Sequence, residues 1–207
     1  MKNNNILPQN LNDILIGLML GDGHLYKSSP TSNSRFEISF GKDREFFAIW
    51  VSDLFEDYSN SGIKIIYYDK SLLSTSFGYR FKTKSLSIFN YYHDLFYKKD
   101  NTIWKYKKIV PSNIKNLMNP IVLAYLIMTD GNFDKSRNRI RIYTNSYSKL
   151  EVEKLAKSIE LKLDIYVGVL HDRKDQWILT IGAQQLDKLR SLVKPHFEPS
   201  MLYRLGY

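Results

Sequence analysis

The chain has 207 residues, of which 43% are hydrophobic, and it carries a formal net charge of +9. This length suits one ordinary domain or two half-size units that share a core, and the hydrophobic content excludes a disordered chain. The absence of cysteine excludes disulfides, zinc fingers and thiol catalysis, no apolar run is long enough to span a bilayer, and the positive charge favours a polyanionic partner such as nucleic acid.

The first predicted element is a buried helix near the N-terminus. Residues 13–24 read Asp-Ile-Leu-Ile-Gly-Leu-Met-Leu-Gly-Asp-Gly-His, an apolar run that ends in Asp22 and Gly23. Because the run is apolar on nearly every side, we expect a helix that is buried all round. Asn12 or Asp13 is the expected N-cap, and Gly23 can take the left-handed conformation that ends a helix.

The next elements follow from changes in the period of the apolar residues. After the first helix the pattern has period two, then becomes helical, then returns to period two. We expect a strand at 34–40, a helix at 43–58, strands at 62–68 and 76–84, and a closing helix at 85–97. Residues 98–119 form a basic stretch that contains Pro111, Ser112 and Asn113, and we interpret this stretch as a linker.

The same order of elements then occurs again. Residues 121–132 read Ile-Val-Leu-Ala-Tyr-Leu-Ile-Met-Thr-Asp-Gly-Asn, a second apolar run that ends in Asp130 and Gly131. Asn119 is the expected N-cap, Pro120 the first helical residue, and Gly131 a second left-handed stop. Strands are expected near 138–144, 163–170 and 176–181, and helices near 148–161 and 183–194. The sequence therefore predicts an α+β fold of two pseudo-symmetric repeats, 1–97 and 120–207, each with the order helix, two strands, helix, two strands, helix.

Asp22 and Asp130 are the first candidates for chemistry. A single Asp-Gly after a helix is most simply a turn, but two copies after matched buried helices favour a shared role. If the two helices pack side by side and run parallel, both carboxylates emerge at the same edge of the molecule, close enough to share divalent cations. Hard oxygen ligands favour Mg²⁺.

Basic residues alternate with apolar residues in two of the expected strands. Arg137, Arg139 and Arg141 form one set, and the other set consists of Arg80, Lys82 and Lys84. Alternation puts each set on one face of its strand. An ordinary solvated face usually mixes both signs of charge, so sets of one sign favour a β-surface that lies along DNA.

Two segments identify a family by resemblance. Leu15 to Gly23 and Leu123 to Gly131 both resemble the nine-residue LAGLIDADG signature of homing endonucleases. Residues 104–131 look like the linker region of single-chain, two-motif members encoded in organellar introns, and Pro199 to Leu205 is similar to the tail of that subgroup. The resemblance therefore covers nearly the full chain. It implies a saddle of antiparallel sheets with the two motif helices packed at the centre, in a monomer that acts as a pseudo-dimer.

The resemblance also implies roles for individual residues. The eighth motif position, Asp22 and Asp130, is the metal-binding acid of the family, and the seventh, Gly21 and Thr129, offers a backbone carbonyl to the metal. A basic residue follows each half and lies near the scissile phosphates, and Lys108 and Arg204 occupy those places. The implied cofactor is two or more Mg²⁺ ions, or another divalent cation such as Mn²⁺, shared between the two acids.

The third motif position is normally glycine, which permits close helix contact. Gly17 keeps this glycine in the first motif, whereas Tyr125 replaces it in the second. We therefore expect the close contact to shift toward Ala124.

The activity implied by the resemblance is site-specific cleavage of both strands of DNA at a long asymmetric target, with short 3′ overhangs. Strand residues are the candidates for DNA contact: Arg35, Glu37, Lys64, Arg80, Lys82, Lys84, Arg137, Arg139 and Arg141. Two alternatives use the same fold: an RNA maturase that helps its own group I intron to splice, and a DNA-binding regulator that no longer cuts. The presence of both acids favours cleavage.

The expected location is an organelle, either a mitochondrion or a chloroplast. Abundant Lys, Asn, Ile, Tyr and Phe indicate an AT-rich coding genome, and residues 1–8 match neither a signal peptide nor a transit peptide. Both features fit synthesis inside an organelle. We expect no membrane partner.

Overall fold

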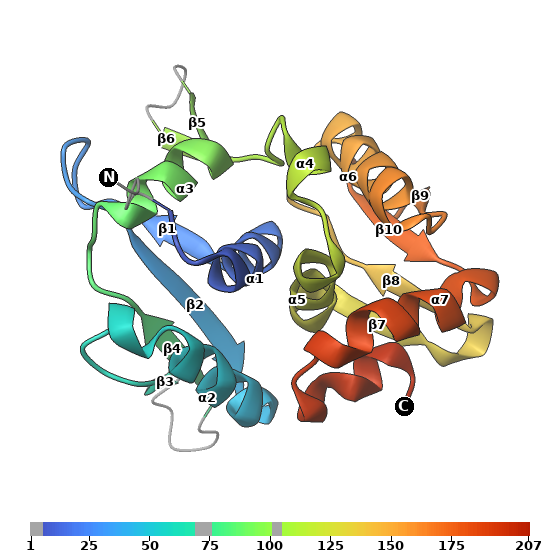
Figure 1. The fold of residues 1–207 in the computed structure, drawn as a ribbon, viewed down its shortest axis with the longest axis horizontal. Coiled ribbons are helices and arrows are strands. Elements are labelled where there is room, and N and C mark those ends of the chain that lie inside the picture. The colour runs from blue at the N-terminus through green and yellow to red at the C-terminus, as the bar shows by residue number, and fades with distance from the viewer. Residues whose placement is uncertain (1–5, 69–75, 101–104) are drawn as a thin grey trace. The chain divides into compact units, whose positions relative to one another are not determined.

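A computed structural model describes residues 6–68, 76–100 and 105–207 (Figure 1). The chain divides into two compact units: unit 1 comprises Met1–Leu11 and Asp22–His93, and unit 2 comprises Asn12–Gly21 and Asp94–Tyr207. The expectations for residues 1–8 and for the linker 98–119 fall partly on residues 1–5 and 101–104, which lie outside the described residues. Within the described ranges, no helix combines the length and the apolar character needed to cross a membrane.

Unit 1 is built on a four-stranded antiparallel sheet. Its strands have the order β1-β2-β4-β3, and helix α2 packs against β2 and β4. The elements are β1 (His24–Tyr26), β2 (Arg35–Gly41), α2 (Glu45–Leu54), β3 (Lys64–Tyr67), β4 (Phe77–Lys82) and α3 (Ile88–Phe96), whose last turn belongs to unit 2.

The core of unit 1 is aromatic. Phe36, Ile38 and Phe40 of β2 are buried, as the alternating pattern predicts for one face of a strand. The ring of Phe36 lies 5.4 Å from that of Phe55, and Phe40 meets Phe47 edge to face at 5.4 Å. Because one face of the sheet is used for this packing, the charged residues of β2 and β4 lie on the other face.

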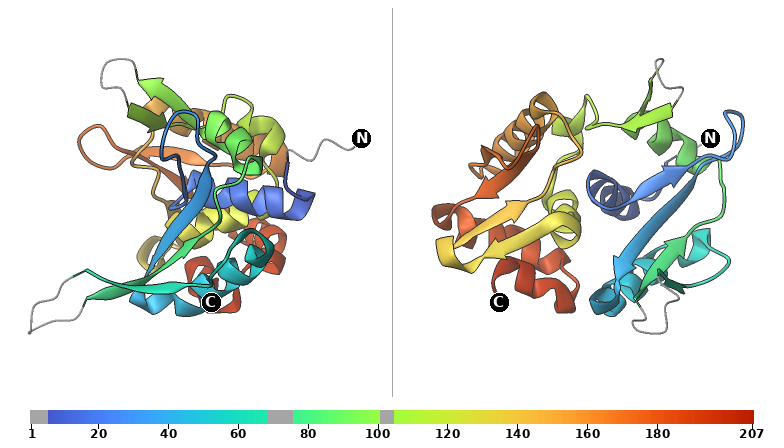
Figure 2. Two further views of the ribbon diagram at one scale, coloured as in Figure 1. Left: turned by 90° about the vertical axis from the view of Figure 1, so that its left-hand side faces the viewer. Right: turned by 180° about the vertical axis from the view of Figure 1, so that it is seen from behind.

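Unit 2 contains a second four-stranded antiparallel sheet with the order β7-β8-β10-β9. Helix α6 packs against β9 and β10, while α5 and α7 both contact β8. A separate hairpin is formed by β5 and β6 (Figure 2). The elements are β5 (Tyr97–Asp100), β6 (Lys105–Lys108), α4 (Ile114–Leu117), α5 (Pro120–Asp130), β7 (Gly131–Asp134), β8 (Arg139–Ile142), α6 (Lys149–Leu163), β9 (Gly168–His171), β10 (Trp177–Ile181), α7 (Ala183–Val193) and a 3₁₀ turn at Pro199–Leu205.

The predicted fold class is confirmed. Both halves follow the order helix, two strands, helix, two strands, helix, and both sheets are antiparallel. The linker prediction was incomplete, because this stretch contains the β5–β6 hairpin and α4. The strand expected near 163–170 begins only at Gly168, since α6 continues to Leu163. The boundaries of the two sequence repeats stay a prediction.

The predicted helix ends were partly wrong. Asn119 does cap α5, and its side chain accepts a hydrogen bond from the Val122 N–H at 3.0 Å. Helix α1, however, begins at Gln9 (Gln9–Leu20), before the expected caps. Gly131 does not take a left-handed conformation: its φ is −76°, so it opens β7 directly. A glycine is still needed there, because a Cβ at this position would lie 2.5 Å from the Ile127 carbonyl oxygen.

Within unit 2, helices α1 and α5 meet at Gly17. All residues from Asn12 to Leu20 and from Val122 to Thr129 are buried. A Cβ on Gly17 would lie 2.6 Å from the Val122 carbonyl oxygen and 2.7 Å from the Tyr125 Cβ. This close contact involves Val122 and Tyr125, and the expected shift toward Ala124 stays a prediction. Gly17 provides space for this approach, opposite the tyrosine that replaces the second glycine.

Gly17→Ala should destabilise the protein. The added methyl group would overlap a backbone oxygen that cannot move without displacing α5, and overpacking of this kind costs about 1–3 kcal/mol of the free energy of unfolding. Urea denaturation followed by circular dichroism measures the loss. Gly182→Ala is the matched control, because a Cβ there has no atom within 4 Å. Equal midpoints for the two variants would contradict the close contact.

Candidate functional site

The C-terminal ends of α1 and α5 touch each other in unit 2. A Cβ built on Gly21 would lie 2.0 Å from Thr129 Oγ1 and 2.6 Å from Asp130 Oδ2. Only glycine fits at position 21, because any side chain would collide with both residues. The backbone of the first motif is therefore in direct contact with the carboxylate of the second.

Lys108 joins these residues from the end of β6. Its Nζ donates a hydrogen bond to the Gly21 carbonyl oxygen at 2.6 Å, and its side chain is half-buried. A short contact between an ammonium group and a carbonyl is charge-assisted and stronger than a neutral hydrogen bond. The Gly21 carbonyl thus already holds a cationic group beside Asp130.

Tyr147, in the segment between β8 and α6, contacts the C-terminal end of α1. Its hydroxyl donates to the Leu20 carbonyl oxygen at 3.0 Å, and the residue is 3% exposed. Burial raises the pKa of Tyr147 far above its usual value, and the charge of Asp130 raises it further. The phenol therefore remains protonated and acts as a donor that holds the end of α1 in place.

Asp22 follows Gly21 directly in the chain and belongs to unit 1. Its Oδ2 lies 3.3 Å from Arg44 Nη1, and the Asp22 side chain is 41% exposed. A pocket at this place is lined by these two residues together with His24, Ser39, Gly41 and Asp43. Asp22 therefore faces an open polar pocket beside a guanidinium group.

Arg204 lies on the 3₁₀ turn at Pro199–Leu205, which packs against α5 and β7. The residue is 7% exposed, and its guanidinium carbon lies 5.5 Å from the centre of the Tyr203 ring. The turn is held at its end by Gly206, which has a φ of 85° and lies against the Phe133 ring. Arg204 is thus anchored beside the strand that begins directly after Asp130.

The sheet of unit 1 has a basic face opposite its aromatic core. Strand pairing puts Glu37 beside Lys82 and puts Arg80 beside both Ser39 and Lys64, and directly opposed residues of an antiparallel pair point to the same face. We name this surface the first basic face, and its cations are Arg35, Lys64, Arg80 and Lys82.

Lys84 is not part of the first basic face. Strand β4 ends at Lys82, so the predicted extension of this strand to residue 84 was wrong. The Lys84 Nζ instead donates a hydrogen bond to the Asp57 carbonyl oxygen at 3.1 Å.

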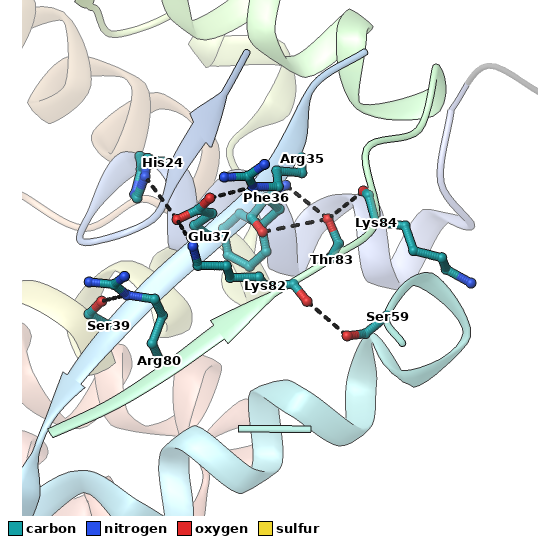
Figure 3. Close-up of polar contacts among 10 residues, drawn as sticks. All are labelled: His24, Arg35, Phe36, Glu37, Ser39, Ser59, Arg80, Lys82, Thr83 and Lys84. Atoms are coloured by element: carbon teal, nitrogen blue, oxygen red, sulfur yellow. Dashed lines mark hydrogen bonds and ion pairs between the residues drawn. The ribbon is translucent and has the colours of Figure 1, made fainter. Parts of the chain in front are cut away.

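Glu37 lies among the cations of the first basic face (Figure 3). Its carboxylate is 2.5 Å from Arg35 Nε, 3.3 Å from Lys82 Nζ and 3.7 Å from His24 Nε2. Burial opposes ionisation of Glu37, but the hydrogen bonds and charges of Arg35 and Lys82 outweigh it and lower its pKa. The acid is therefore charged at neutral pH, and this face is not of one sign.

The sheet of unit 2 carries the second basic face, which consists of Arg139 and Arg141 on β8. Ile140 and Ile142, which alternate with them, are fully buried. One carboxylate oxygen, Asp134 Oδ2 on β7, lies 3.1 Å from Arg139 Nε and 2.8 Å from Arg141 Nη2. The prediction that Arg137 shares this strand face was wrong, because Arg137 belongs to a 3₁₀ turn at Lys135–Arg137 that precedes β8.

The ion pairs of Asp134 predict a pH dependence of stability. The hydrogen bond from Ser136 has the largest effect, burial opposes it, and Arg139 and Arg141 add to it, so the pKa of Asp134 falls from 3.8 to about 2. A carboxyl group whose pKa is lower in the folded state stabilises the protein above its unfolded pKa, and this contribution is lost as the pH falls toward the folded pKa. We expect the urea midpoint to fall between about pH 4 and pH 2.

Asp134→Asn should lose less stability over that pH interval than the unmodified protein. Asp187→Asn is the control, because the Asp187 side chain is fully exposed. Parallel curves for the unmodified protein and for Asp134→Asn would show that these ion pairs do not contribute to stability.

Several residues of the site could not be identified from the sequence. Arg44 and His24 meet Asp22 and Glu37 only through the pairing and connections of β1 and β2. Tyr147 reaches α1 across 127 residues of sequence. Asp134 is the missed residue that the sequence could most easily have identified, since it precedes Arg139 by five residues, which is the spacing of a short hairpin. Among the residues that the structure describes, no group of three or more His, Cys, Asp or Glu could hold a metal ion.

Comparison with protein families gives one match that covers most of the chain. A model described as the LAGLIDADG DNA endonuclease family matches residues 12–189. The chain is similar to cytochrome b mRNA maturase bI2 of Saccharomyces cerevisiae, with 28% identity over 99% of this chain, and it spans only 49% of that protein. It is also 33% identical to intron-encoded endonuclease ai4 of Dictyostelium discoideum, over 62% of this chain and 77% of that protein.

Two solved structures show a similar fold. The homing endonuclease I-WcaI bound to its DNA recognition sequence has a TM-score of 0.84 and 22% identity, over 97% of this chain and 87% of that one. A variant of I-DmoI, in complex with its target DNA and in the presence of Mn, has a TM-score of 0.59 and 19% identity, over 89% of this chain and 93% of that one.

Proposed function

Because this chain belongs to the LAGLIDADG DNA endonuclease family, we propose that it is a site-specific endonuclease that cuts both strands of DNA by metal-dependent hydrolysis. The observation that carries the proposal is the meeting of Gly21, Asp130 and Lys108 at the ends of α1 and α5. Asp22, the acid of the first motif, follows Gly21 directly in the chain, and we propose that it serves the same metal ions as Asp130.

The donor atoms at these helix ends fit a hard divalent cation. Asp130 supplies a carboxylate beside Gly21, and the Gly21 carbonyl already accepts an ammonium group. Mg²⁺ prefers oxygen ligands of this kind. We assign Asp22 and Asp130 as metal ligands together with the backbone carbonyls of Gly21 and Thr129, with two or more Mg²⁺ or Mn²⁺ ions shared between the acids. Bound there, the cations would polarise the scissile phosphate and lower the pKa of the attacking water.

The basic residues beside the helix ends stabilise charge during hydrolysis. Lys108 presents an ammonium group next to Asp130, where it would offset the negative charge that develops on the phosphate. Arg204 remains protonated at any physiological pH, so it can stabilise charge but cannot accept a proton. The raised pKa of Tyr147 likewise excludes it as a base, and its role is to hold α1.

The two basic faces are the proposed DNA-binding surfaces. The first presents Arg35, Lys64, Arg80 and Lys82, whereas the second presents Arg139 and Arg141, so the two halves of a target would be read by different side chains. A long asymmetric target, read by one chain that acts as a pseudo-dimer, follows from this difference. Arg137 and Lys84 lie outside the strands, and we propose that they contact DNA phosphates if they contact DNA at all.

A maturase function is the second candidate. The similarity to the yeast cytochrome b mRNA maturase extends over 99% of this chain, and a basic surface also suits RNA. Its ligand would be the intron RNA from which the chain is expressed. Because relatives include an intron-encoded endonuclease, we propose an organellar intron, in a mitochondrion or a chloroplast, as the source of the gene.

Cleavage of DNA without the intron tests the proposal. A plasmid that carries the uninterrupted host gene is incubated with the protein in Mg²⁺ and, separately, in EDTA. Linear plasmid in Mg²⁺ and intact plasmid in EDTA are expected. Intact plasmid in both would reject the nuclease, and splicing of the intron RNA by the same preparation would then support the maturase.

A further inference from the structure

Each basic face contains one carboxylate with little solvent exposure that contacts two or more cations. Glu37 on β2 contacts Arg35, Lys82 and His24 (Figure 3). Asp134 on β7 contacts Arg139 and Arg141 through a single oxygen, and its Oδ1 accepts from Ser136 Oγ at 2.7 Å. The side chains of the two acids are only 8% and 12% exposed. Each of the two basic faces, which we propose to bind DNA, therefore includes one fixed negative charge.

The two acids occupy different positions in otherwise matching sheets. Tyr26 pairs with Arg35 in the first sheet, and Asp134 pairs with Arg139 in the second. Tyr26 and Asp134 both lie four residues after the aspartate of their motif. Arg35 and Arg139 thus hold equivalent positions. Their carboxylate partners do not, because Glu37 lies on the same strand as Arg35 whereas Asp134 lies on the neighbouring strand. An arginine at this position is paired with a carboxylate in both sheets, although the carboxylate comes from different strands. This indicates that the arginine must be held in a fixed orientation.

The physical effect of each acid on DNA binding is twofold. A carboxylate near the phosphates repels them, so it weakens the attraction of the neighbouring cations to any DNA. It also holds a long side chain in one rotamer before binding, which lowers the entropy cost of a contact that requires this geometry. Both effects weaken non-directional contacts with the DNA phosphates more than they weaken directed hydrogen bonds to the bases.

We propose that Glu37 and Asp134 are positioning residues that set the sequence specificity of the two basic faces. Glu37 orients Arg35 and Lys82, and Asp134 orients Arg139 and Arg141, so that the base sequence and not the backbone charge determines the affinity. The inference rests on the proposed DNA binding of these faces.

Two binding measurements on Glu37→Gln and Asp134→Asn test the inference. The first is the affinity for a 30-bp duplex of arbitrary sequence across a range of KCl concentrations. We expect each variant to bind about threefold or more tightly, with a salt dependence steeper by about one released counterion, because a freed cation can contact a phosphate. The second is selection from a pool of randomised duplexes followed by sequencing. Each variant should lose base preference in one half of the selected site and keep it in the other.

Asp164→Asn is the matched control for charge. Asp164 is 98% exposed and contacts Lys188 Nζ at 2.5 Å, at the end of α6 and outside both sheets. Its backbone is left-handed, which asparagine tolerates. The control makes the same change of charge and breaks one ion pair, so it should leave the base preferences intact. If it tightens the binding of arbitrary DNA as much as Asp134→Asn does, a general charge effect replaces the inference.

Arg139→Lys covers the case in which Asp134→Asn fails to fold. It keeps the charge but replaces a planar guanidinium by a flexible ammonium, so base preference in the same half-site should weaken at an unchanged salt dependence. Unmodified protein that binds no duplex would reject the proposed function itself. Unmodified protein that selects a site, together with variants that keep its full preference, would reject only the positioning role.

Discussion

Asp22→Asn and Asp130→Asn should each abolish double-strand cleavage while leaving DNA affinity within about threefold of the unmodified protein. Asparagine keeps the shape of the side chain but loses the charge that binds a hard cation. A catalytic metal contributes several kcal/mol to the stabilisation of the transition state, and each 1.36 kcal/mol is about tenfold in rate. We therefore expect a loss of about a thousandfold or more, measured as single-turnover cleavage of a supercoiled plasmid that carries the target.

The control separates a lost metal ligand from lost structure. Asp187→Asn removes an exposed acid from α7 and should cut at the unmodified rate. The affinity of all three variants for the target is measured in Ca²⁺ and in EDTA. Loss of binding by the Asp22 or Asp130 variant would show that these acids are structural, and cleavage at the unmodified rate would remove them from the metal site.

The sequence was sufficient for the long elements, because each of them has its own period. The two motif helices are apolar on all sides, and β2 alternates through Phe36, Ile38 and Phe40, so both patterns are local. Strands β1 and β7 were missed because they are short and begin where a turn was expected, β1 directly after Gly23 and β7 at Gly131 itself. Asn138 shows the same limit: its φ of 43° ends the 3₁₀ turn and excludes Arg137 from β8.

Some residues of the candidate site could likewise be predicted from local sequence, and others could not. Asp22 and Asp130 were predicted because they lie within the two motifs, and Lys108 was predicted from the resemblance of the linker region. The contacts of Arg44, Tyr147 and Asp134 depend on which segments the fold brings together, and no local period records such contacts. The basic sets on the strands were interpreted as surfaces of one sign, whereas the acids Glu37 and Asp134 lie among the cations.

Lys108→Met should lower the rate of cleavage by about a hundredfold with less than a tenfold loss of DNA affinity. The ammonium group lies 2.6 Å from the Gly21 carbonyl oxygen, beside Asp130. Removal of one well-placed charge from a reacting centre costs about 2.7 kcal/mol or more when it acts only in the transition state, which is about a hundredfold in rate. Methionine preserves most of the apolar stem, so the packing of β6 should remain.

Lys107→Met is the control for charge, since Lys107 is the adjacent residue of the same strand and its side chain is exposed. Lys107→Met should cut at the unmodified rate. If both variants cut equally slowly, Lys108 acts only through the general electrostatic attraction of DNA. The products add a further distinction. If Lys108 serves the phosphate of one strand and Arg204 that of the other, Lys108→Met should accumulate nicked circular plasmid before linear plasmid. Slowing of both cuts to the same extent would instead assign Lys108 to the metal ligands common to the two cleavages.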